Sequence, residues 1–408
     1  MQNSAQHHIA NSGFYGLGIA PALLEILRRL KFTDPTPIQT QAIPIAIQGK
    51  DMVGIAQTGT GKTFAFGIPM IQRLEQIRKR GLVVVPTREL ALQVDEELRK
   101  IGKSLELRTV VLIGGTSIGP QIHALSRRPH IIIATPGRLI DHLNQRTVRL
   151  DDVGIVVLDE ADRMLDMGFL PQIQKILQQL PKDRQTMLFS ATMPSEIMKI
   201  AAAYMKLPVR VEMAPTGTLV ESVTQELFIV SKDQKPALLG KLLQSYQGSA
   251  LIFTRTKYGA TKLMRHIRNL GIGAAELHSN RTLGQRRQAL EGFKLGRYRV
   301  LVATDIASRG IDVVGIELVI NYDLPSTSDD YVHRIGRTAR AGAQGHAITF
   351  AMPQEQYEVR AIERLIRKPL SVSKLPELPL VQFESSSSYR PQRKPWSQGK
   401  NRFRRDRS

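Results

Sequence analysis

One short stretch constrains this chain more than any other, the sequence AQTGTGKT at residues 56–63. The apolar run at 52–55 precedes it and predicts a strand, and residues 64–70 predict the start of a helix. A Gly-rich turn between a strand and a helix binds phosphate, because its backbone N–H groups and the positive end of the helix dipole converge on one anion. A Gly-rich turn that matches by chance is the alternative, and the complete match in this context disfavours it.

Within this stretch, the residue types suit the parts of a nucleoside triphosphate. Gly59 and Gly61 allow tight backbone turns. Lys62 can reach the β- and γ-phosphates, and the Thr63 hydroxyl can ligate Mg²⁺. The predicted ATP-binding loop comprises Ala56, Gln57, Thr58, Gly59, Thr60, Gly61, Lys62 and Thr63.

Composition narrows the class of protein and its partners. The chain has 408 residues, enough for two domains plus tails, and 42% of them are hydrophobic. It has 57 Lys and Arg residues against 36 acidic ones, a net charge of +21 that favours nucleic acid or an anionic membrane surface as partner. The lack of cysteine excludes disulfides and thiolate metal sites. Because no apolar run approaches membrane-spanning length and the first ten residues lack the features of a secretion signal, we expect a cytoplasmic location.

Two side chains upstream of the loop suit a purine base. Residues 32–39 have the sequence FTDPTPIQ, in which the prolines hold the chain extended before a helix that starts near Gln39. Phe32 offers a ring for stacking, and the Gln39 amide has the donor and the acceptor that the N6 and N7 edge of adenine requires. A Pro-Thr-Pro connector with no ligand role is the alternative.

Short apolar runs alternate with helical segments through residue 212, and each run ends in a polar cluster. Continuous β-branched runs predict strands of a parallel sheet covered on both faces. Since ligands bind beyond the carboxyl ends of such strands, we expect the clusters to face one cleft. The clusters are Pro86-Thr87-Arg88, Gly114-Gly115, Thr135-Pro136-Gly137-Arg138, Asp159-Glu160-Ala161-Asp162 and Ser190-Ala191-Thr192.

The acidic cluster supplies two carboxylates with different predicted tasks. Asp159 can hold Mg²⁺ through a bound water, and Glu160 can orient and deprotonate an attacking water. Most Asp-Glu pairs are surface charge, but this pair follows a buried-strand pattern downstream of a complete phosphate loop. That context favours a catalytic interpretation.

A second domain and a basic tail complete the chain. Pro, Gly and Thr without periodicity at 213–222 predict a linker, and a second alternating set of runs follows without its own Gly-rich loop. In this domain Arg337 and Arg340 lie three apart and can present two guanidiniums to a phosphate as arginine fingers, which requires the domains to close. A basic helix face that binds nucleic acid or water is the alternative.

The tail at 389–408 has eight basic residues and one acid, a net charge of +7. It cannot bury a core, so the sequence predicts disorder. Tyr389, Trp396 and Phe403 lie among the arginines, an arrangement that suits stacking on unpaired bases together with phosphate attraction. A solubilising tail is the alternative.

Taken in order, these motifs resemble those of the DEAD-box RNA helicases, from about Phe14 to about Arg367. The compact core with a short basic tail is most similar to the bacterial RhlE-type group. The motifs are FTDPTPIQ from Phe32, AQTGTGKT from Ala56, PTREL from Pro86, Gly114-Gly115, TPGR from Thr135, DEAD from Asp159, SAT from Ser190, ATDIASRGID from Ala303 and HRIGRTAR from His333. The resemblance implies two tandem RecA-like α/β domains with parallel sheets that bind ATP and RNA across a shared cleft. The expected boundaries are a disordered N-terminus at 1–13, domain one at 14–212, a flexible linker at 213–222, domain two at 223–369 and a disordered basic tail at 370–408.

By matching position, the resemblance also assigns roles. Phe32 and Gln39 contact adenine, and Asp312 contacts the ribose. Coupling of the nucleotide site to the RNA site is assigned to Asp162, Ser190, Thr192 and His333. RNA contacts are assigned to Pro86, Thr87, Arg88, Gly115, Thr135, Arg138, Arg286 and Thr304. The implied ligands are ATP, Mg²⁺ and RNA held by its backbone with little sequence preference, and the further partners are ribosomal or RNA-degradation proteins.

Three residues depart from the family pattern. Lys31 and Ala339 stand where the family usually has Gly, and Leu283 stands where it has Gln, which removes a hydrogen-bonding group beside the RNA. The expected activity is that of an ATP-dependent RNA helicase that unwinds short duplexes locally or remodels RNA–protein complexes. The alternatives are an RNA-binding clamp or annealing protein with a vestigial ATPase, and a DNA helicase of the same superfamily.

Overall fold

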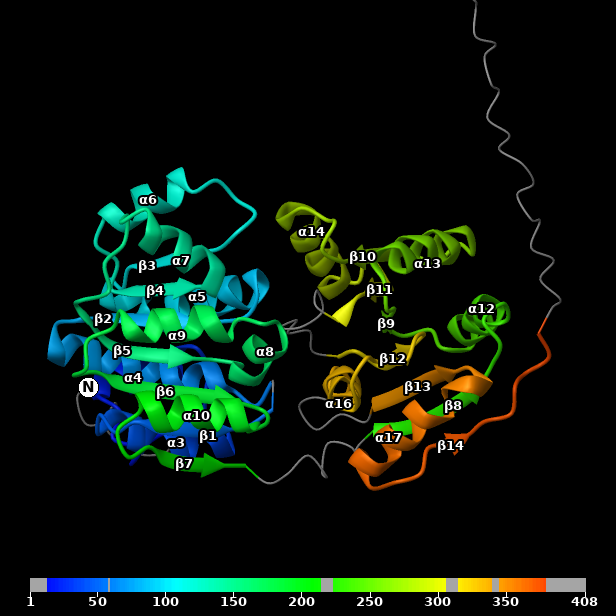
Figure 1. Ribbon diagram of the computed structural model, residues 1–408, viewed down its shortest axis with the longest axis horizontal. Helices are drawn as coiled ribbons and strands as arrows, with labels where there is room; N and C mark the ends of the chain where they lie inside the picture. The colour runs from blue at the N-terminus through cyan, green and yellow to red at the C-terminus, as the bar shows by residue number, and fades with distance from the viewer. Residues whose placement is uncertain (1–12, 58, 214–222, 306–314, 340–344, 379–408) are drawn as a thin grey trace, which may run out of the picture.

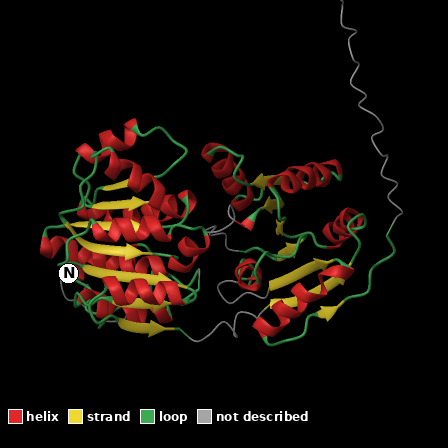
Figure 2. Ribbon diagram, viewed as in Figure 1, coloured by secondary structure: helices red, strands yellow, loops and turns green. Residues whose placement is uncertain are grey.

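Two parallel seven-stranded sheets with helices on their faces form the body of the molecule (Figures 1 and 2). The computed structural model describes residues 13–57, 59–213, 223–305, 315–339 and 345–378. The RecA-like two-domain architecture expected from the sequence is confirmed. The predicted disordered N-terminus, linker and basic tail fall largely outside the described residues. Among the described residues, no helix has the length and apolar character needed to cross a membrane.

The first sheet has the order β3-β4-β2-β5-β6-β1-β7. Its strands are β1 (Met52–Ile55), β2 (Arg80–Val84), β3 (Thr109–Leu112), β4 (Ile131–Ala134), β5 (Val153–Leu158), β6 (Gln185–Ser190) and β7 (Val209–Glu212). Its helices are α2 (Pro21–Arg29), α3 (Pro37–Ile47), α4 (Lys62–Ile77), α5 (Arg88–Gly102), α6 (Gly119–Ser126), α7 (Pro136–Asn144), α8 (Ala161–Asp166), α9 (Leu170–Gln178) and α10 (Ser195–Tyr204), with a 3₁₀ turn at Lys103–Leu105. The central strands are buried on both faces, which explains their uninterrupted apolar sequences.

The second sheet repeats this order as β10-β11-β9-β12-β13-β8-β14. Its strands are β8 (Val223–Ile229), β9 (Ala250–Phe253), β10 (Ala274–Leu277), β11 (Val300–Ala303), β12 (Leu318–Asn321), β13 (Gly345–Ala351) and β14 (Ser371–Val372). Its helices are α12 (Lys235–Ser245), α13 (Lys257–Asn269), α14 (Leu283–Lys294), α16 (Ser328–Ile335) and α17 (Gln356–Ile366), with a 3₁₀ turn at Pro353–Glu355. The sheet therefore continues past residue 369, where the sequence suggested that the tail begins.

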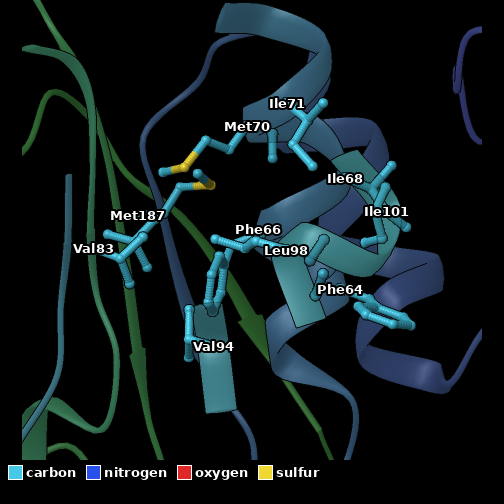
Figure 3. Close-up of a cluster of buried hydrophobic side chains, with 14 of the residues drawn as sticks. Phe64, Phe66, Ile68, Met70, Ile71, Val83, Val94, Leu98, Ile101 and Met187 are labelled. Carbon is cyan, nitrogen blue, oxygen red and sulfur yellow. The ribbon is translucent and has the colours of Figure 1, made fainter. Parts of the chain in front are cut away.

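The packing of α4 fixes the start of the phosphate loop's helix. Figure 3 shows Phe66 and Met70 of α4 between Val83 and Met187 on the sheet and Leu98 on α5. All five side chains are fully buried. Burial of each such side chain contributes about 1.5–3 kcal/mol, so the first turn of α4, which begins at Lys62, has little freedom to shift.

Candidate functional site

The phosphate loop joins β1 to α4 in the predicted manner. Gly59 and Gly61 have φ values of 86° and 88°, a left-handed conformation that glycine adopts without strain. Lys62 is only 6% exposed, and its Nζ lies 3.8 Å from Asp159 Oδ1. Among the described residues this buried ammonium has no hydrogen-bond partner. A buried charged donor without a partner is costly, so the site is built to receive an anionic ligand, and a nucleotide phosphate fits it.

The second domain provides an internal comparison, because α12 begins at Lys235 as α4 begins at Lys62. Lys235 is equally buried, but its Nζ donates to Tyr322 O at 2.8 Å and lies 3.5 Å from Asp323 Oδ1. The lysine of the second sheet is therefore already satisfied by the protein. Of the two topologically equivalent positions, Lys62 is the one left available for a phosphate.

Gln39 connects the segment upstream of the loop to the loop itself. Its Oε1 accepts from the Thr36 backbone N–H at 2.9 Å, and its Nε2 donates to Gly61 O at 3.0 Å. The sequence predicted an adenine contact for Gln39 but not this bridge. Phe32 packs edge-on against Phe64 of α4, with ring centroids 4.6 Å apart. Both predicted base-contacting residues are therefore fixed relative to α4.

Asp159 and Glu160 follow β5 and are both 3% exposed. Burial raises the pKa of Asp159 to about 6. Burial also opposes ionisation of Glu160, but Arg163, Lys62 and Arg337 outweigh it and hold the pKa of that carboxyl below its usual range. Two adjacent carboxyl groups thus differ in their proton affinity, and Glu160 is the more readily ionised of the two.

Arg163 is a site residue that sequence reasoning did not single out. It is 2% exposed, and its Nη1 lies 2.6 Å from Glu160 Oε2. The signal that could have identified it is its spacing from Glu160, because residues three positions apart lie on the same helix face. Arg163 therefore keeps Glu160 ionised and fixes its orientation.

Asp162 joins the acidic cluster to the Ser-Ala-Thr segment after β6. Its Oδ2 accepts from the backbone N–H groups of Ala191 and Thr192 at 3.0 and 2.8 Å and from Thr192 Oγ1 at 3.0 Å. Its own backbone N–H donates to Ser190 Oγ at 3.1 Å. The predicted coupling residues Asp162, Ser190 and Thr192 are therefore brought into one network.

The second domain contributes charge to this site. Arg337, which is 3% exposed, lies near enough to Glu160 to lower the pKa of that carboxyl. His333 faces the first domain. Burial, which is the larger cause, and the charge of Arg163 lower the pKa of its imidazole to about 4. The other predicted members of the nucleotide site, Thr58, Asp312 and Arg340, lie outside the described residues.

The predicted RNA residues of the first domain gather at the carboxyl ends of β2, β3 and β4. Pro86 and Thr87 are buried between β2 and α5, and Thr87 Oγ1 caps α5 by accepting from Leu90 N–H at 3.2 Å. Arg88 lies against Gly115, where an added Cβ would meet the guanidinium. Arg138 Nη2 donates to Thr116 O at 3.1 Å. Thr135 precedes α7 at the same edge, and in the second domain Thr304 follows β11 with its N–H bonded to Leu277 O at 3.2 Å.

Arg286, a predicted RNA-contacting residue, has its side chain against the first domain. Its Nη2 lies 2.9 Å from Glu89 Oε2 of α5, and both side chains are 10% exposed. Leu283, one turn earlier on α14, packs against the first domain's hydrophobic cluster, to which α4 and α5 both contribute. The two residues together form a contact between α14 and the first domain that was not predictable from the sequence.

Comparisons with known proteins agree with this geometry. Residues 36–200 match the DEAD/DEAH box helicase domain, and residues 234–342 match the helicase conserved C-terminal domain. A DEAD-box ATP-dependent RNA helicase, CshA of Bacillus licheniformis, is 44% identical over 90% of this chain and 76% of its own length. The chain belongs to the DEAD-box RNA helicases. The family is thus confirmed, whereas the RhlE-type subgroup finds no support in relatives that carry the name CshA.

Solved structures of the family also inform the arrangement of the two domains. S. cerevisiae Dbp5 bound to RNA and ADP BeF3 superposes with a TM-score of 0.80 at 30% identity, covering 89% of this chain and 95% of Dbp5. A DEAD box protein from Methanococcus jannaschii is 36% identical over 88% of this chain and 99% of its own, yet reaches a TM-score of only 0.51. Dbp5 therefore has the higher TM-score although its sequence identity is lower. This indicates that the two domains of the helicase described here are placed relative to each other as in the RNA-bound complex.

Proposed function

We propose that this helicase hydrolyses ATP when its two domains close on RNA, and that closure unwinds short duplexes locally or remodels RNA–protein complexes. The observation that carries the proposal is the buried Nζ of Lys62, which has no hydrogen-bond partner in the described part of the chain and lies 3.8 Å from Asp159 Oδ1. Arg337 reaches the same site from the other domain. Hydrolysis that needs groups from both domains is coupled to closure, because ATP then favours the closed form through its differential contacts.

Individual roles follow from position and chemistry. Lys62 binds the β- and γ-phosphates, and Thr63 and Asp159, the latter through water, hold Mg²⁺, which neutralises phosphate charge when bound. Among the described residues no group of three or more His, Cys, Asp or Glu side chains is arranged so that it could hold a metal ion. Glu160, held by Arg163, orients the attacking water and takes its proton. Arg337 and Arg340 stabilise charge on the transferring phosphoryl group.

The remaining assignments concern base, ribose and RNA. Phe32 stacks on adenine, Gln39 binds its N6 and N7 edge, and Asp312 contacts the ribose. RNA backbone contacts are assigned to Pro86, Thr87, Arg88, Gly115, Thr135, Arg138, Arg286 and Thr304. Because the proposed contacts reach phosphate and sugar, we expect little sequence preference.

Steady-state ATP hydrolysis tests the proposal directly. Rates are measured with no nucleic acid, with single-stranded RNA and with DNA of matched sequence, all at one salt concentration. Strong stimulation by RNA alone is the expected result. RNA binding without hydrolysis would instead indicate a clamp with a vestigial ATPase, and equal stimulation by DNA would indicate a DNA helicase.

The role of Glu160 has its own test. Glu160→Gln keeps the size of the side chain and one oxygen for Arg163 but cannot accept a proton. We expect ATP and RNA binding to persist while turnover falls by roughly 10²–10⁴-fold, the usual contribution of a general base. Nucleotide affinity and the unfolding midpoint of the variant serve as controls. Undiminished hydrolysis would reject the assignment.

We further propose a cytoplasmic location, and ribosomal or RNA-degradation proteins as partners. The support is the net charge of +21, which suits RNA-rich particles, and the absence of cysteine. Co-sedimentation of the full chain with ribosomal particles, before and after RNase treatment, tests the partner proposal. RNase-resistant association is expected, and its absence would exclude direct binding to ribosomal proteins.

A further inference from the structure

A hollow of about 650 Å³ lies on the outer face of the second domain, between α13 and the turn after β10. Four basic side chains line it, and none of its lining residues is an Asp or a Glu. The lining residues used below, here named the α13 face, are Lys257, Tyr258, Lys262, Arg265, Asn280 and Arg281.

The helix itself is unusual in its charge. Residues 257–269 include four Lys or Arg residues and no acid. On several other described helices a basic residue has a carboxylate three or four positions away, as in Arg28–Glu25, Arg99–Asp95 and Arg287–Glu291. Because α13 lacks such carboxylates, its positive charge is not neutralised within the helix.

Neighbouring contacts hold this surface in shape. Lys257 Nζ donates to Asn280 Oδ1 at 2.9 Å, which joins the first turn of α13 to the turn after β10. Arg281 is paired with the buried Glu276, whose other oxygen lies 2.8 Å from His278 Nε2. Tyr258 is 74% exposed, and its ring centroid lies 5.4 Å from Lys257 Nζ. Tyr258, Lys262 and Arg265 lie four and three positions apart, so they share one helix face.

The α13 face adjoins the proposed RNA path. Thr304 bonds to Leu277 O, and Leu277 is followed directly by His278, which lines the hollow. Figure 1 shows α13 and α14 beside β10, at the end of the second sheet opposite β14. The hollow therefore begins at His278, one residue beyond the Leu277 carbonyl that Thr304 contacts.

We propose that the α13 face is an additional RNA-binding surface that holds the single strand where it leaves the cleft between the domains. Lys262 and Arg265 bind successive phosphates, and the exposed Tyr258 ring stacks on an unpaired base. Such a combination of a basic groove and an aromatic stacking surface binds single-stranded nucleic acid with little sequence preference. The inference rests on the proposed function, because it extends the same RNA path.

The chain offers a matched control surface on the same domain. Tyr357, Arg360 and Arg364 of α17 have nearly the same spacing, and Tyr357 is 75% exposed. They line a hollow of about 590 Å³ that also includes Glu363. Since α17 lies on a different side of the second domain (Figure 1), loss of two charges there tests for a general charge effect.

The experiment compares binding of a short RNA of about six nucleotides, which fills only the cleft, with that of a long RNA of about 20 nucleotides. The double variant Lys262→Gln/Arg265→Gln is measured beside the wild type and Arg360→Gln/Arg364→Gln at several salt concentrations. For the α13 variant we expect long-RNA affinity to fall about tenfold. The slope of log affinity against log salt concentration should become shallower by about 1.4, because two phosphate contacts are missing. Tyr258→Ala should weaken long-RNA binding without changing that slope.

Short-RNA binding and short-RNA-stimulated ATPase should be the same in all four proteins. An equal loss in the α17 control, or unchanged long-RNA affinity in the α13 variant, would overturn the inference while leaving the proposed function intact. Unchanged RNA affinity with reduced binding of polyglutamate would assign the face to an acidic protein instead. Absence of short-RNA binding by the wild type would overturn the proposed function itself.

Discussion

At the scale of single residues, the structure gives two of the family departures a physical consequence. Lys31 and Ala339, which stand where relatives usually have Gly, have φ values of 61° and 54°. A side chain in this left-handed conformation costs roughly 1–2 kcal/mol, whereas Gly adopts it without strain. Both positions therefore retain the backbone geometry of a glycine without the residue that suits it.

We expect Lys31→Gly and Ala339→Gly each to raise the free energy of unfolding by about 0.5–1 kcal/mol. The gain is smaller than the strain because Gly also increases the entropy of the unfolded chain. Denaturant midpoints measure the effect. Lys31→Ala keeps a Cβ and should give no gain, so equal stabilisation by Ala would assign the effect to lost charge or side-chain contacts.

His333 makes closure sensitive to pH. His333 faces the first domain, and the pKa of its imidazole is lowered there to about 4. An exposed histidine titrates near 6.5. Protonation therefore favours the form in which His333 leaves the first domain, and closure weakens as the pH falls from about 6.5 towards 4. The ratio of open to closed molecules should rise about tenfold by about pH 5.5.

Because the chain has no cysteine, two introduced cysteines can carry dyes that report the distance between the domains. His333→Gln should flatten the pH dependence. Asp159, with a pKa of about 6, titrates in the same window in both proteins, so the difference between them isolates His333. Identical profiles would show that His333 does not control opening.

At the scale of elements, the strands with continuous apolar runs were predictable from the sequence. The strands β7, β10 and β14, whose apolar runs are not continuous, were not predicted. In β10 the run is interrupted by Glu276, a buried carboxylate that Thr261, His278 and Arg281 satisfy. β7 and β14 lie at sheet edges and keep polar residues.

The residues of the phosphate loop were predictable because they are contiguous. The bridge from Gln39 to Gly61 and the pair Glu89–Arg286 were not, since partners far apart in sequence leave no local pattern.

The contact between α5 and α14 leads to a prediction about Leu283. Its apolar side chain supports closure without any RNA, whereas a Gln would lose roughly 1 kcal/mol of that packing. Leu283→Gln should therefore lower ATP hydrolysis measured without nucleic acid by about fivefold and increase the relative stimulation by RNA. Leu283→Met keeps apolar volume and is the control. If Met and Gln reduced the basal rate equally, apolar packing would not be the cause.

At the scale of the whole molecule, closure unites the features described above. The lowered pKa of Glu160 depends in part on Arg337 from the other domain, and α14 meets α5 through Arg286 and Glu89. Both contacts join the two domains in the structure described here, whose placement resembles that of the RNA-bound neighbour. Mutations at either contact should therefore affect ATP turnover and RNA affinity together.

The basic tail acts at this same scale. Its predicted RNA contacts lie outside the described residues, but the described chain ends on the second domain, where Lys241 Nζ donates to Glu377 O at 2.7 Å. Deletion of residues 389–408 removes eight basic residues, so RNA binding should weaken and its salt slope should fall by up to about 5.6. Basal ATPase should survive, because Lys62, Asp159 and Glu160 remain.

Combining this deletion with Lys262→Gln/Arg265→Gln distinguishes two ways in which the second domain can extend its hold on RNA. If the tail and the α13 face contact separate phosphates, their losses of salt slope should add, as they do for independent sites. If the tail lies along the α13 face and guides RNA onto it, the double variant should lose little beyond the deletion alone. An unchanged salt slope after deletion would show that the tail is not on the RNA, and the tail's net charge of +7 would then concern solubility rather than binding.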